Sequence, residues 1–294
     1  MKKISIIGAG TMGNGIAQVF AMNNYHVNLI DLNSNSLTNA INRITTNLDR
    51  MIKRDIISSD QKTATLDNIS ITTDINYAKS SDLVIEAVTE NIGIKLKLFK
   101  QLDQICSKET ILATNTSSIS ITEIAASTNR PEKVIGMHFM NPVPIMKLVE
   151  VIRGRKTSDE TTKTIIELSE TVKKIAIEVN DYPGFIANRI LLPMINEAIE
   201  ALNTGVAKVN NIDSIMKIGM GYPMGPLQLA DFIGLDVCLS ILEVMHEGFK
   251  DLKYAPSELL VNMVKSGKLG VKSGEGFYDY SESKKAELVA KQFQ

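Results

Sequence analysis

The sequence predicts a doubly wound, mostly parallel α/β sheet followed by a smaller, all-α domain. Three observations support this. Short β-branched runs alternate with helical patterns in the first half, a glycine-rich turn follows the first run directly, and strand-like runs end near residue 183. Such alternation is typical of βαβ units, whose parallel strands are covered by helices on both faces. We expect one domain over 1–183 and a second over 184–294.

Six short segments of the first half are predicted strands. Each is nearly continuously apolar, as is typical of strands buried inside a parallel sheet. They span 4–7, 26–30, 69–72, 83–88, 110–114 and 134–139. Between them, apolar residues such as Ile41, Ile44 and Leu48 recur at the spacing of one helix face. The pattern therefore predicts a series of strands joined by helices.

The second half is expected to be helical. Gly and Pro divide it into four segments with helical patterns, which span 184–203, 210–218, 225–249 and 256–265. The D-Y-P-G segment at 181–184 lies where the character of the sequence changes. We take this segment as the joint between the two predicted domains.

Composition excludes several classes of function. The net charge is −1, from 32 basic and 33 acidic residues spread along the chain, so no basic surface for nucleic acid or an anionic membrane is expected. No apolar run approaches the length of a membrane span, and the short apolar run after Met1 enters a glycine motif instead of a cleavage site. Cys106 and Cys238 show no metal or redox spacing and are expected to be buried thiols. These features predict a cytoplasmic protein with a small-molecule partner and no metal.

The motif G-A-G-T-M-G at 8–13 lies between a predicted strand and a predicted helix, which is the context of a dinucleotide-binding (Rossmann-type) turn. Gly8 permits the tight turn, Gly10 lets the backbone approach a pyrophosphate, and Gly13 lets helix and strand pack closely. Asp31 ends the next strand and should accept hydrogen bonds from the adenosine ribose while repelling a 2′-phosphate. No arginine follows it, so NAD is favoured over NADP.

The segment G-M-H-F-M-N-P-V-P-I-M-K-L-V-E-V-I at 136–152 indicates two strands joined by a proline-rich turn. If the turn centres on Pro144, His138 and Glu150 lie at equal distances from it and face each other across an antiparallel pair. Glu150 would then orient the imidazole as a general base. The alternative is a core histidine bonded to backbone, with a carboxylate at the sheet edge. His26 and His246 lack such a partner and are interpreted as structural.

With these motifs in view, the chain resembles the 3-hydroxyacyl-CoA dehydrogenases, particularly the short bacterial 3-hydroxybutyryl-CoA dehydrogenases. The resemblance runs nearly end to end. It includes G-A-G-T-M-G-N-G-I-A-Q, T-N-T-S-S, the 136–152 segment, P-G-F-I-A-N-R-I-L-L-P-M-I-N-E-A, P-M-G-P-L-Q-L-A-D-F-I-G-L-D and G-E-G-F-Y-D-Y. It implies hydride transfer between NAD(H) and a short 3-hydroxyacyl-CoA or 3-oxoacyl-CoA, in fatty acid or butanoate metabolism, by a homodimer. It also implies that 1–183 form the dinucleotide-binding domain and that the helical domain, 184–294, serves substrate binding and dimerisation.

The resemblance also implies roles for individual residues. His138 matches the histidine that exchanges a proton with the 3-hydroxyl, and Glu150 matches its carboxylate partner. Ser117 matches a residue that hydrogen-bonds the substrate near the reacting oxygen, and Asn188 matches one that holds the substrate from the second domain. Four further residues match positions near the nicotinamide ribose or elsewhere along the cofactor: Glu90, Lys95, Asn115 and Asn141.

Each of these assignments competes with a structural alternative. Ser117 precedes Ser-Ile-Thr-Glu, a helix-start pattern, and could be an N-cap. Asn188 could bond the neighbouring turn of its helix. Lys95 lies in K-L-K-L-F-K, which is also the pattern of a solvated helix face.

One segment departs from the family pattern. Close relatives often carry Lys-Lys-Gly-Lys where lysines meet the CoA phosphates, whereas residues 53–56 here are Lys-Arg-Asp-Ile. Lys53 is the expected surviving contact, and Ile56 replaces the last lysine of the family pattern. Two other functions stay open. One is a catalytically silent NAD-binding relative, and the other is a β-hydroxyacid dehydrogenase acting on a free acid with a lysine as acid/base.

Overall fold

The computed structural model describes residues 1–294 and divides into two compact units, Met1–Tyr182 and Pro183–Gln294. The division lies inside the D-Y-P-G segment at 181–184. Each unit has its own cluster of buried apolar side chains. Each is therefore described by itself.

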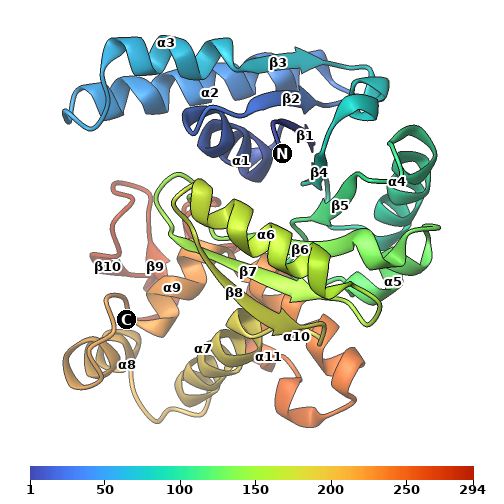
Figure 1. Ribbon diagram of the computed structural model, residues 1–294. Helices are drawn as coiled ribbons and strands as arrows, with labels where there is room; N and C mark the ends of the chain where they lie inside the picture. Colours follow the sequence, from blue (N-terminus) through green and yellow to red (C-terminus); the bar gives the residue numbers. More distant parts are fainter. The chain divides into compact units, whose positions relative to one another are not determined.

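The first unit is built on one eight-stranded sheet with the order β3-β2-β1-β4-β5-β6-β7-β8 (Figure 1). Neighbouring strands are parallel throughout, except that β7 runs antiparallel to β6. The doubly wound, mostly parallel sheet is thus confirmed. The strands are β1 Lys3–Ile7, β2 His26–Ile30, β3 Ile69–Thr72, β4 Leu83–Glu86, β5 Ile111–Thr114, β6 Val134–Phe139, β7 Leu148–Arg153 and β8 Ile175–Asn180.

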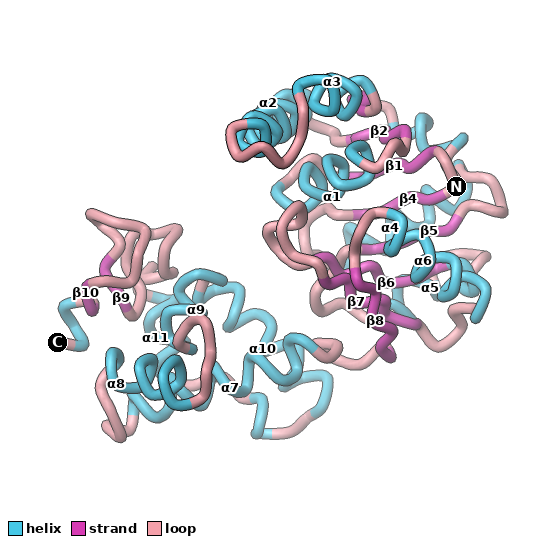
Figure 2. Tube along the Cα trace, turned by 60° about the vertical axis from the view of Figure 1, so that its left-hand side comes forward, coloured by secondary structure: helices cyan, strands magenta, loops and turns pink.

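Helices cover both faces of this sheet. Apolar residues of α1, α2 and α6 share one core with alternate residues of the strands, and α4 and α5 pack against each other outside that core. Figure 2 shows the strands as one continuous stack between these helices. The helices of the first unit are α1 Thr11–Met22, α2 Ser34–Ile52, α3 Ser59–Asp67, α4 Ile92–Ile105, α5 Ile121–Ala126 and α6 Asp159–Thr171, with 3₁₀ turns η1 Ile75–Ser80 and η2 Pro131–Lys133.

Strand β8 is missing from the strands expected in the first half. Its sequence I-A-I-E-V-N carries a glutamate and an asparagine, and most of its residues are exposed because it is the last strand of the sheet. A continuous apolar run is typical of a strand buried on both faces, and β8 has no such run. The strand expected over 83–88 also ends earlier, at Glu86.

The second unit is mainly helical, as expected, but the helix predicted over 225–249 is two helices. Gly234, with φ +104°, ends one and begins the other. The chain after α8 continues as a short π-helix. An antiparallel pair of two-residue strands follows α11, so strands are not confined to the first half of the chain. The elements are α7 Ala187–Asn203, α8 Val209–Ser214, η3 Ile215–Gly219, α9 Pro226–Ile233, α10 Leu235–Phe249, η4 Leu252–Tyr254, α11 Glu258–Lys265, β9 Tyr278–Asp279, β10 Leu288–Val289 and η5 Lys291–Phe293.

Two buried carboxylates tie distant segments of the second unit together. Asp213 accepts hydrogen bonds from the backbone N–H groups of Leu227 (2.9 Å) and Gln228 (3.0 Å) at the start of α9, and from the Tyr278 hydroxyl (2.7 Å). A Cβ on Gly225 would lie 2.2 Å from the Asp213 carboxyl carbon. The P-M-G-P-L-Q motif is therefore a tight fit of the α9 N-terminus onto Asp213.

Asp231 fixes the segment G-E-G-F-Y in the same way. Its carboxylate accepts from the backbone N–H groups of Phe277 (3.0 Å) and Tyr278 (2.9 Å) and from the Tyr280 hydroxyl (3.1 Å). A Cβ on Gly276 would lie 1.9 Å from an Asp231 oxygen. Burial raises the pKa of Asp231 to about 7, because desolvation outweighs these hydrogen bonds.

Candidate active site

The glycine-rich turn between β1 and α1 has the geometry that a dinucleotide requires. Gly8 has φ +102°, and a Cβ on Gly13 would lie 1.8 Å from the Gly8 carbonyl oxygen. A Cβ on Gly10 would meet nothing within 4 Å. Gly10 is the N-cap of α1, whose first turn has no side-chain cap and no acidic residue. The helix amides therefore border open space, where a pyrophosphate would be stabilised.

Asp31, directly after β2, is held beside this turn. Its carboxylate accepts hydrogen bonds from the backbone N–H groups of Ala9 (2.8 Å) and Asn33 (2.9 Å). Each carboxylate oxygen has further lone pairs that could accept ribose hydroxyls. The residues of this corner thus fit an adenosine dinucleotide.

The predicted register of β6 and β7 is confirmed. His138 is paired directly with Glu150 across the antiparallel ladder, and its Nδ1 lies 2.7 Å from Glu150 Oε2. Both side chains are buried, at 10% and 4% exposure. Glu150 is therefore the partner of the imidazole and not an unrelated carboxylate at the sheet edge.

His138 and Glu150 point to the sheet face opposite the α1 and α6 core. Their strand neighbours Met137 and Val149 belong to that core, and successive side chains of a strand point to opposite faces. The same alternation places Glu86, the last residue of β4, on the α4 and α5 face. Polar side chains at the carboxyl ends of neighbouring strands thus share one face.

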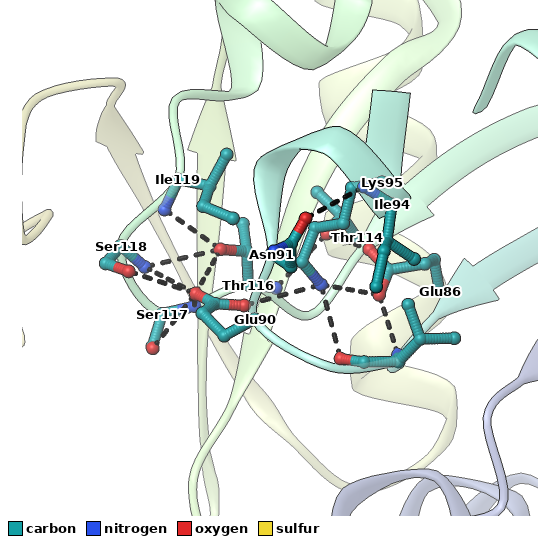
Figure 3. Close-up of polar contacts among 11 residues, drawn as sticks. Glu86, Glu90, Asn91, Ile94, Lys95, Thr114, Thr116, Ser117, Ser118 and Ile119 are labelled. Carbon is teal, nitrogen blue, oxygen red and sulfur yellow. Dashed lines mark hydrogen bonds and ion pairs between the residues drawn. The ribbon is translucent and has the colours of Figure 1, made fainter. Parts of the chain in front are cut away.

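Glu86 is the centre of a buried ion pair. Its Oε1 lies 2.5 Å from Lys95 Nζ, and Lys95 and Glu86 side chains are 1% and 0% exposed (Figure 3). Glu86 Oε1 also accepts from the backbone N–H of Val88 (2.7 Å), and Oε2 accepts from the Thr114 hydroxyl (2.6 Å). Lys95 therefore lies inside the unit, and the alternative of a solvated helix face is wrong for it.

Glu90 accepts several hydrogen bonds from the turn that contains Ser117. Its Oε1 accepts from the Thr116 hydroxyl (2.5 Å) and from the backbone N–H of Ser117 (2.9 Å) and of Ser118 (3.2 Å), while its Oε2 lies 3.3 Å from Lys95 Nζ (Figure 3). Burial tends to raise the pKa of Glu90, but the Lys95 charge and these hydrogen bonds outweigh it and lower the pKa. Glu90 is thus an anion at neutral pH.

The helix N-cap alternative for Ser117 is wrong. The residue that caps α5 is Ser120, whose hydroxyl accepts from the Glu123 backbone N–H at 3.2 Å. Ser117 lies three residues earlier, and its hydroxyl is 3.3 Å from Glu90 Oε1. The structure therefore places Ser117 in the turn after β5, at the same sheet edge as Glu86.

Asn115 joins the ends of three strands. Its backbone N–H donates to Glu86 O (2.8 Å) in β4, and its side-chain Oδ1 accepts from the Phe139 N–H (2.9 Å), next to His138. Asn141 lies two residues after Phe139 in the exposed turn between β6 and β7. Both residues thus lie along the edge that carries the glycine turn and His138.

A buried lysine that the sequence does not single out holds the turn between His138 and Glu150. Lys174 Nζ donates to the carbonyl oxygens of Val143 (2.5 Å) and Met146 (2.7 Å), and burial lowers its pKa. Val143 in turn packs on α1, since a Cβ on Gly15 would lie 2.9 Å from the Val143 Cβ. Lys174 follows α6 in a K-K pair with no periodic signal, so only the fold could find it.

A cavity of about 530 Å³ lies between α1, α2 and the turn after β6. Arg43 and Arg50 lie on its α2 wall. Lys53, the residue expected to meet a CoA phosphate, is the exposed C-cap of α2 and does not line this cavity. The lining residues are Thr11, Asn14, Gly15, Asn39, Asn42, Arg43, Thr46, Asn47, Arg50, Asn141, Pro142, Val143 and Pro144.

The remaining candidate residues belong to other elements. Asn188 is half-buried in the first turn of α7, in the second unit. His26 is exposed at the start of β2, and His246 Nδ1 lies 3.0 Å from the Asp251 carbonyl oxygen. Cys106 and Cys238 are confirmed as buried free thiols, and burial raises their pKa values to about 11 and about 12.

The structure lacks two further features. No group of three or more His, Cys, Asp or Glu side chains is arranged to hold a metal ion. None of the helices combines the length and the apolar character that crossing a membrane requires.

Comparison with known proteins agrees with this geometry. Residues 3–182 match the family model "3-hydroxyacyl-CoA dehydrogenase, NAD binding domain", and 184–280 match the model of the C-terminal domain of the same family. The chain is 54% identical to a probable 3-hydroxybutyryl-CoA dehydrogenase of Bacillus subtilis, over 96% of this chain and 98% of that protein. It is 48% identical to the 3-hydroxybutyryl-CoA dehydrogenase of Clostridioides difficile, over 95% and 100%.

A solved structure extends the similarity to three dimensions. The crystal structure of (S)-3-hydroxybutyryl-CoA dehydrogenase from Ralstonia eutropha matches with a TM-score of 0.93 and 46% identity, over 96% of this chain and 100% of that one. Both family models, the full-length relatives and this structure agree. The chain belongs to the 3-hydroxyacyl-CoA dehydrogenase family, an NAD-dependent oxidoreductase family, and its first unit is the family's NAD-binding domain.

Proposed function

We propose that the protein transfers a hydride between NAD(H) and a short-chain 3-hydroxyacyl-CoA or 3-oxoacyl-CoA, with 3-hydroxybutyryl-CoA and acetoacetyl-CoA as the expected pair. The observation that carries the proposal is the buried His138–Glu150 pair, 2.7 Å apart, on the edge that also carries the glycine turn. The names of the full-length relatives support the substrate class.

NAD(H), when bound, would supply the hydride chemistry, and in this mechanism His138 moves the proton. Glu150 engages Nδ1, so the proton exchanged with the substrate hydroxyl belongs at Nε2. The Glu150 carboxylate stabilises the imidazolium that forms when the alcohol is oxidised. Ser117, whose backbone N–H donates to Glu90, would hydrogen-bond the reacting oxygen, and Asn188 would contribute a further substrate contact, as the family resemblance implies.

The fold supports a substrate site for the nucleotide of CoA near α2. Arg43 and Arg50 line the cavity beside α1, and Lys53 ends the same helix, so three cations lie along α2. Exposed lysine–phosphate pairs are flexible and screened by salt. We therefore expect Lys53 to assist, and the cavity arginines to hold a phosphate more firmly.

Lys53→Ala should raise the KM for acetoacetyl-CoA only severalfold, within the roughly 1 kcal/mol typical of exposed ion pairs. Arg50→Ala should raise it more. Kinetics with a pantetheine thioester that lacks the nucleotide provide the control, because neither change should affect it. If each change raised the KM for the pantetheine thioester as much as the KM for acetoacetyl-CoA, α2 would not be the site that binds the CoA nucleotide.

The experiment that tests the proposed function is NADH oxidation with acetoacetyl-CoA, run beside free acetoacetate. We expect turnover with the thioester and very little with the free acid. Turnover of the free acid alone would favour the β-hydroxyacid dehydrogenase alternative. NADH binding without turnover of either compound would favour the catalytically silent relative.

We also propose a homodimer formed through the helical unit. Large apolar side chains are exposed on η3 and just after it: Ile215 at 59%, Ile218 at 85% and Met220 at 64%. An exposed apolar patch of this kind is typical of a protein–protein interface. Ile218→Glu should shift the sedimentation coefficient to that of a monomer, whereas Leu252→Glu, at a separate exposed leucine, should not. A monomeric wild-type protein would contradict the proposal.

A further inference from the structure

The buried Glu86–Lys95 pair has no contact through which Glu86 could reach a ligand. Both Glu86 oxygens are engaged inside the unit, by Lys95, the Val88 N–H and the Thr114 hydroxyl. Its side chain has 0% exposure. Any influence of Glu86 on the reaction must therefore pass through another residue.

Such a pair is an expensive way to stabilise a fold. Desolvation of two charges commonly cancels their attraction, and apolar side chains of similar size often give equal or greater stability. The neighbouring strand β1 has an apolar residue, Ile7, at the buried position paired with Glu86. A role other than stability would account for a carboxylate at the end of β4.

The contacts of Lys95 lead from this interior to the open edge. Its ammonium is shared between Glu86, at 2.5 Å, and Glu90, at 3.3 Å. The Glu90 side chain is 38% exposed and collects the backbone N–H groups of Ser117 and Ser118 (Figure 3). Glu86 therefore fixes the cation that fixes Glu90, and Glu90 fixes the Ser117 turn.

This edge lies on the side where the second half of a dinucleotide extends. Asp31 after β2 marks the adenosine side of the glycine turn, and β4, β5 and β6 follow on the other side of β1. Gly8 touches this side directly, because a Cβ there would lie 2.7 Å from the Ala87 carbonyl oxygen after β4. An extended dinucleotide thus passes from Asp31 toward Glu90 and His138.

We propose that Glu86 is a positioning residue for the nicotinamide end of the cofactor, acting through Lys95 on Glu90 and the Ser117 turn. The inference rests on the proposed function for the location of the reacting end. It predicts that the Glu86–Lys95 pair contributes to binding of the whole dinucleotide and not to binding of its ADP-ribose part.

The test compares Glu86→Gln, the double variant Glu86→Gln/Lys95→Met and the surface control Lys97→Met. In Glu86→Gln the buried Lys95 ammonium keeps only Glu90, the more distant carboxylate, so the unfolding temperature of this variant should fall. The double variant removes both charges and should regain most of that loss. Lys97 is exposed on the same helix, and its variant should match the wild type.

Calorimetric titration with NAD⁺ and with ADP-ribose then separates positioning from stability. In Glu86→Gln, measured well below its unfolding temperature and with Lys95 in place, the Kd for NAD⁺ should rise roughly ten- to a hundredfold, as expected for loss of a charge-assisted contact, while the Kd for ADP-ribose stays nearly unchanged. A Glu86→Gln variant that binds NAD⁺ like the wild type would show a merely structural pair. Equal losses for both ligands would also overturn the inference.

This binding test needs no turnover of an acyl-CoA. If the wild type binds NAD⁺ but fails to reduce acetoacetyl-CoA, the proposed function fails while the Glu86 inference can still be judged. If the wild type turns over acetoacetyl-CoA and Glu86→Gln binds NAD⁺ normally, only the Glu86 inference fails.

Discussion

Buried carboxylates occur in both units, and their partners differ. In the first unit Glu86 is paired with Lys95 and Glu150 with His138, at 2.5 and 2.7 Å. In the second unit Asp213 and Asp231 accept hydrogen bonds only from backbone N–H groups and tyrosine hydroxyls, and neither takes part in a salt bridge.

The difference separates two uses of a buried charge. A carboxylate next to an imidazole or ammonium can fix a charge or assist a proton transfer, and both pairs lie at the edge of the sheet that holds the glycine turn. A carboxylate that accepts hydrogen bonds from neutral donors of distant segments holds those segments together and stabilises the fold. The following variants test this division.

The largest effect is expected for the histidine of the first unit. His138→Ala should lower turnover by about 10²–10⁴-fold, the contribution typical of a general acid or base, with NAD⁺ affinity nearly unchanged. His26→Ala, at an exposed histidine in the same sheet, is the matched control. Steady-state kinetics decide, and wild-type turnover in His138→Ala would refute the general-base role.

Asp213→Ala should show the opposite profile. It leaves two backbone N–H groups and the Tyr278 hydroxyl without their buried acceptor, at about 1–3 kcal/mol each, so the free energy of unfolding should drop by roughly 3 kcal/mol or more. Denaturant titration measures the loss, and Glu243→Ala, at an exposed carboxylate of the second unit, is the control. An unchanged free energy of unfolding would show that the hydrogen bonds of Asp213 do not stabilise the second unit.

Asp231 should make stability depend on pH. Its folded pKa, about 7, lies above the ordinary value of 3.8, so the folded state holds the proton more tightly. Its contribution to stability is therefore fully present below about pH 4 and is lost as pH rises toward 7, by at most about 1.4 kcal/mol per pH unit. Thermal melts from pH 5 to 8 should show this slope, and Asp231→Asn should flatten it. If the stability of Asp231→Asn depended on pH as strongly as that of the wild type, other titrating groups would be responsible for the pH dependence.

The smallest of these effects is expected for Glu150→Gln. The imidazole remains and keeps a neutral hydrogen-bond partner, so turnover should fall roughly ten- to a hundredfold, from the loss of a charge-assisted bond. Its unfolding temperature should change little compared with that of Asp213→Ala. If Glu150→Gln lost stability but no turnover, the pair would belong with the stabilising carboxylates of the second unit.

Local sequence patterns were sufficient for most of the first unit. Continuous apolar runs located seven of its strands within a few residues, counting β7, and the equal spacing of His138 and Glu150 from Pro144 was enough to predict their register. Strand β8 escaped because an edge strand alternates and carries polar residues. The break at Gly234 escaped because one glycine in a helical pattern does not itself show a positive φ.

The parts of the site that escaped prediction depend on contacts between distant segments. Glu86 is one acidic residue in L-V-I-E-A-V, and nothing local shows that Lys95 turns inward to meet it. Lys174 likewise becomes meaningful only when β8 brings it under the turn after β6. Periodicity describes which face a residue occupies, but not which distant residue it meets there.

The antiparallel pairing of β6 with β7 determines where this protein could tolerate changes in length. Residues added to the turn after β6 would keep the register of the His138–Glu150 row but would disturb the contacts of Val143 with Lys174 and α1. One residue added within β7 would instead move Glu150 to the opposite face and put an apolar neighbour against the imidazole. A change of length within the turn thus alters its packing, whereas a change within the strand removes the pair itself.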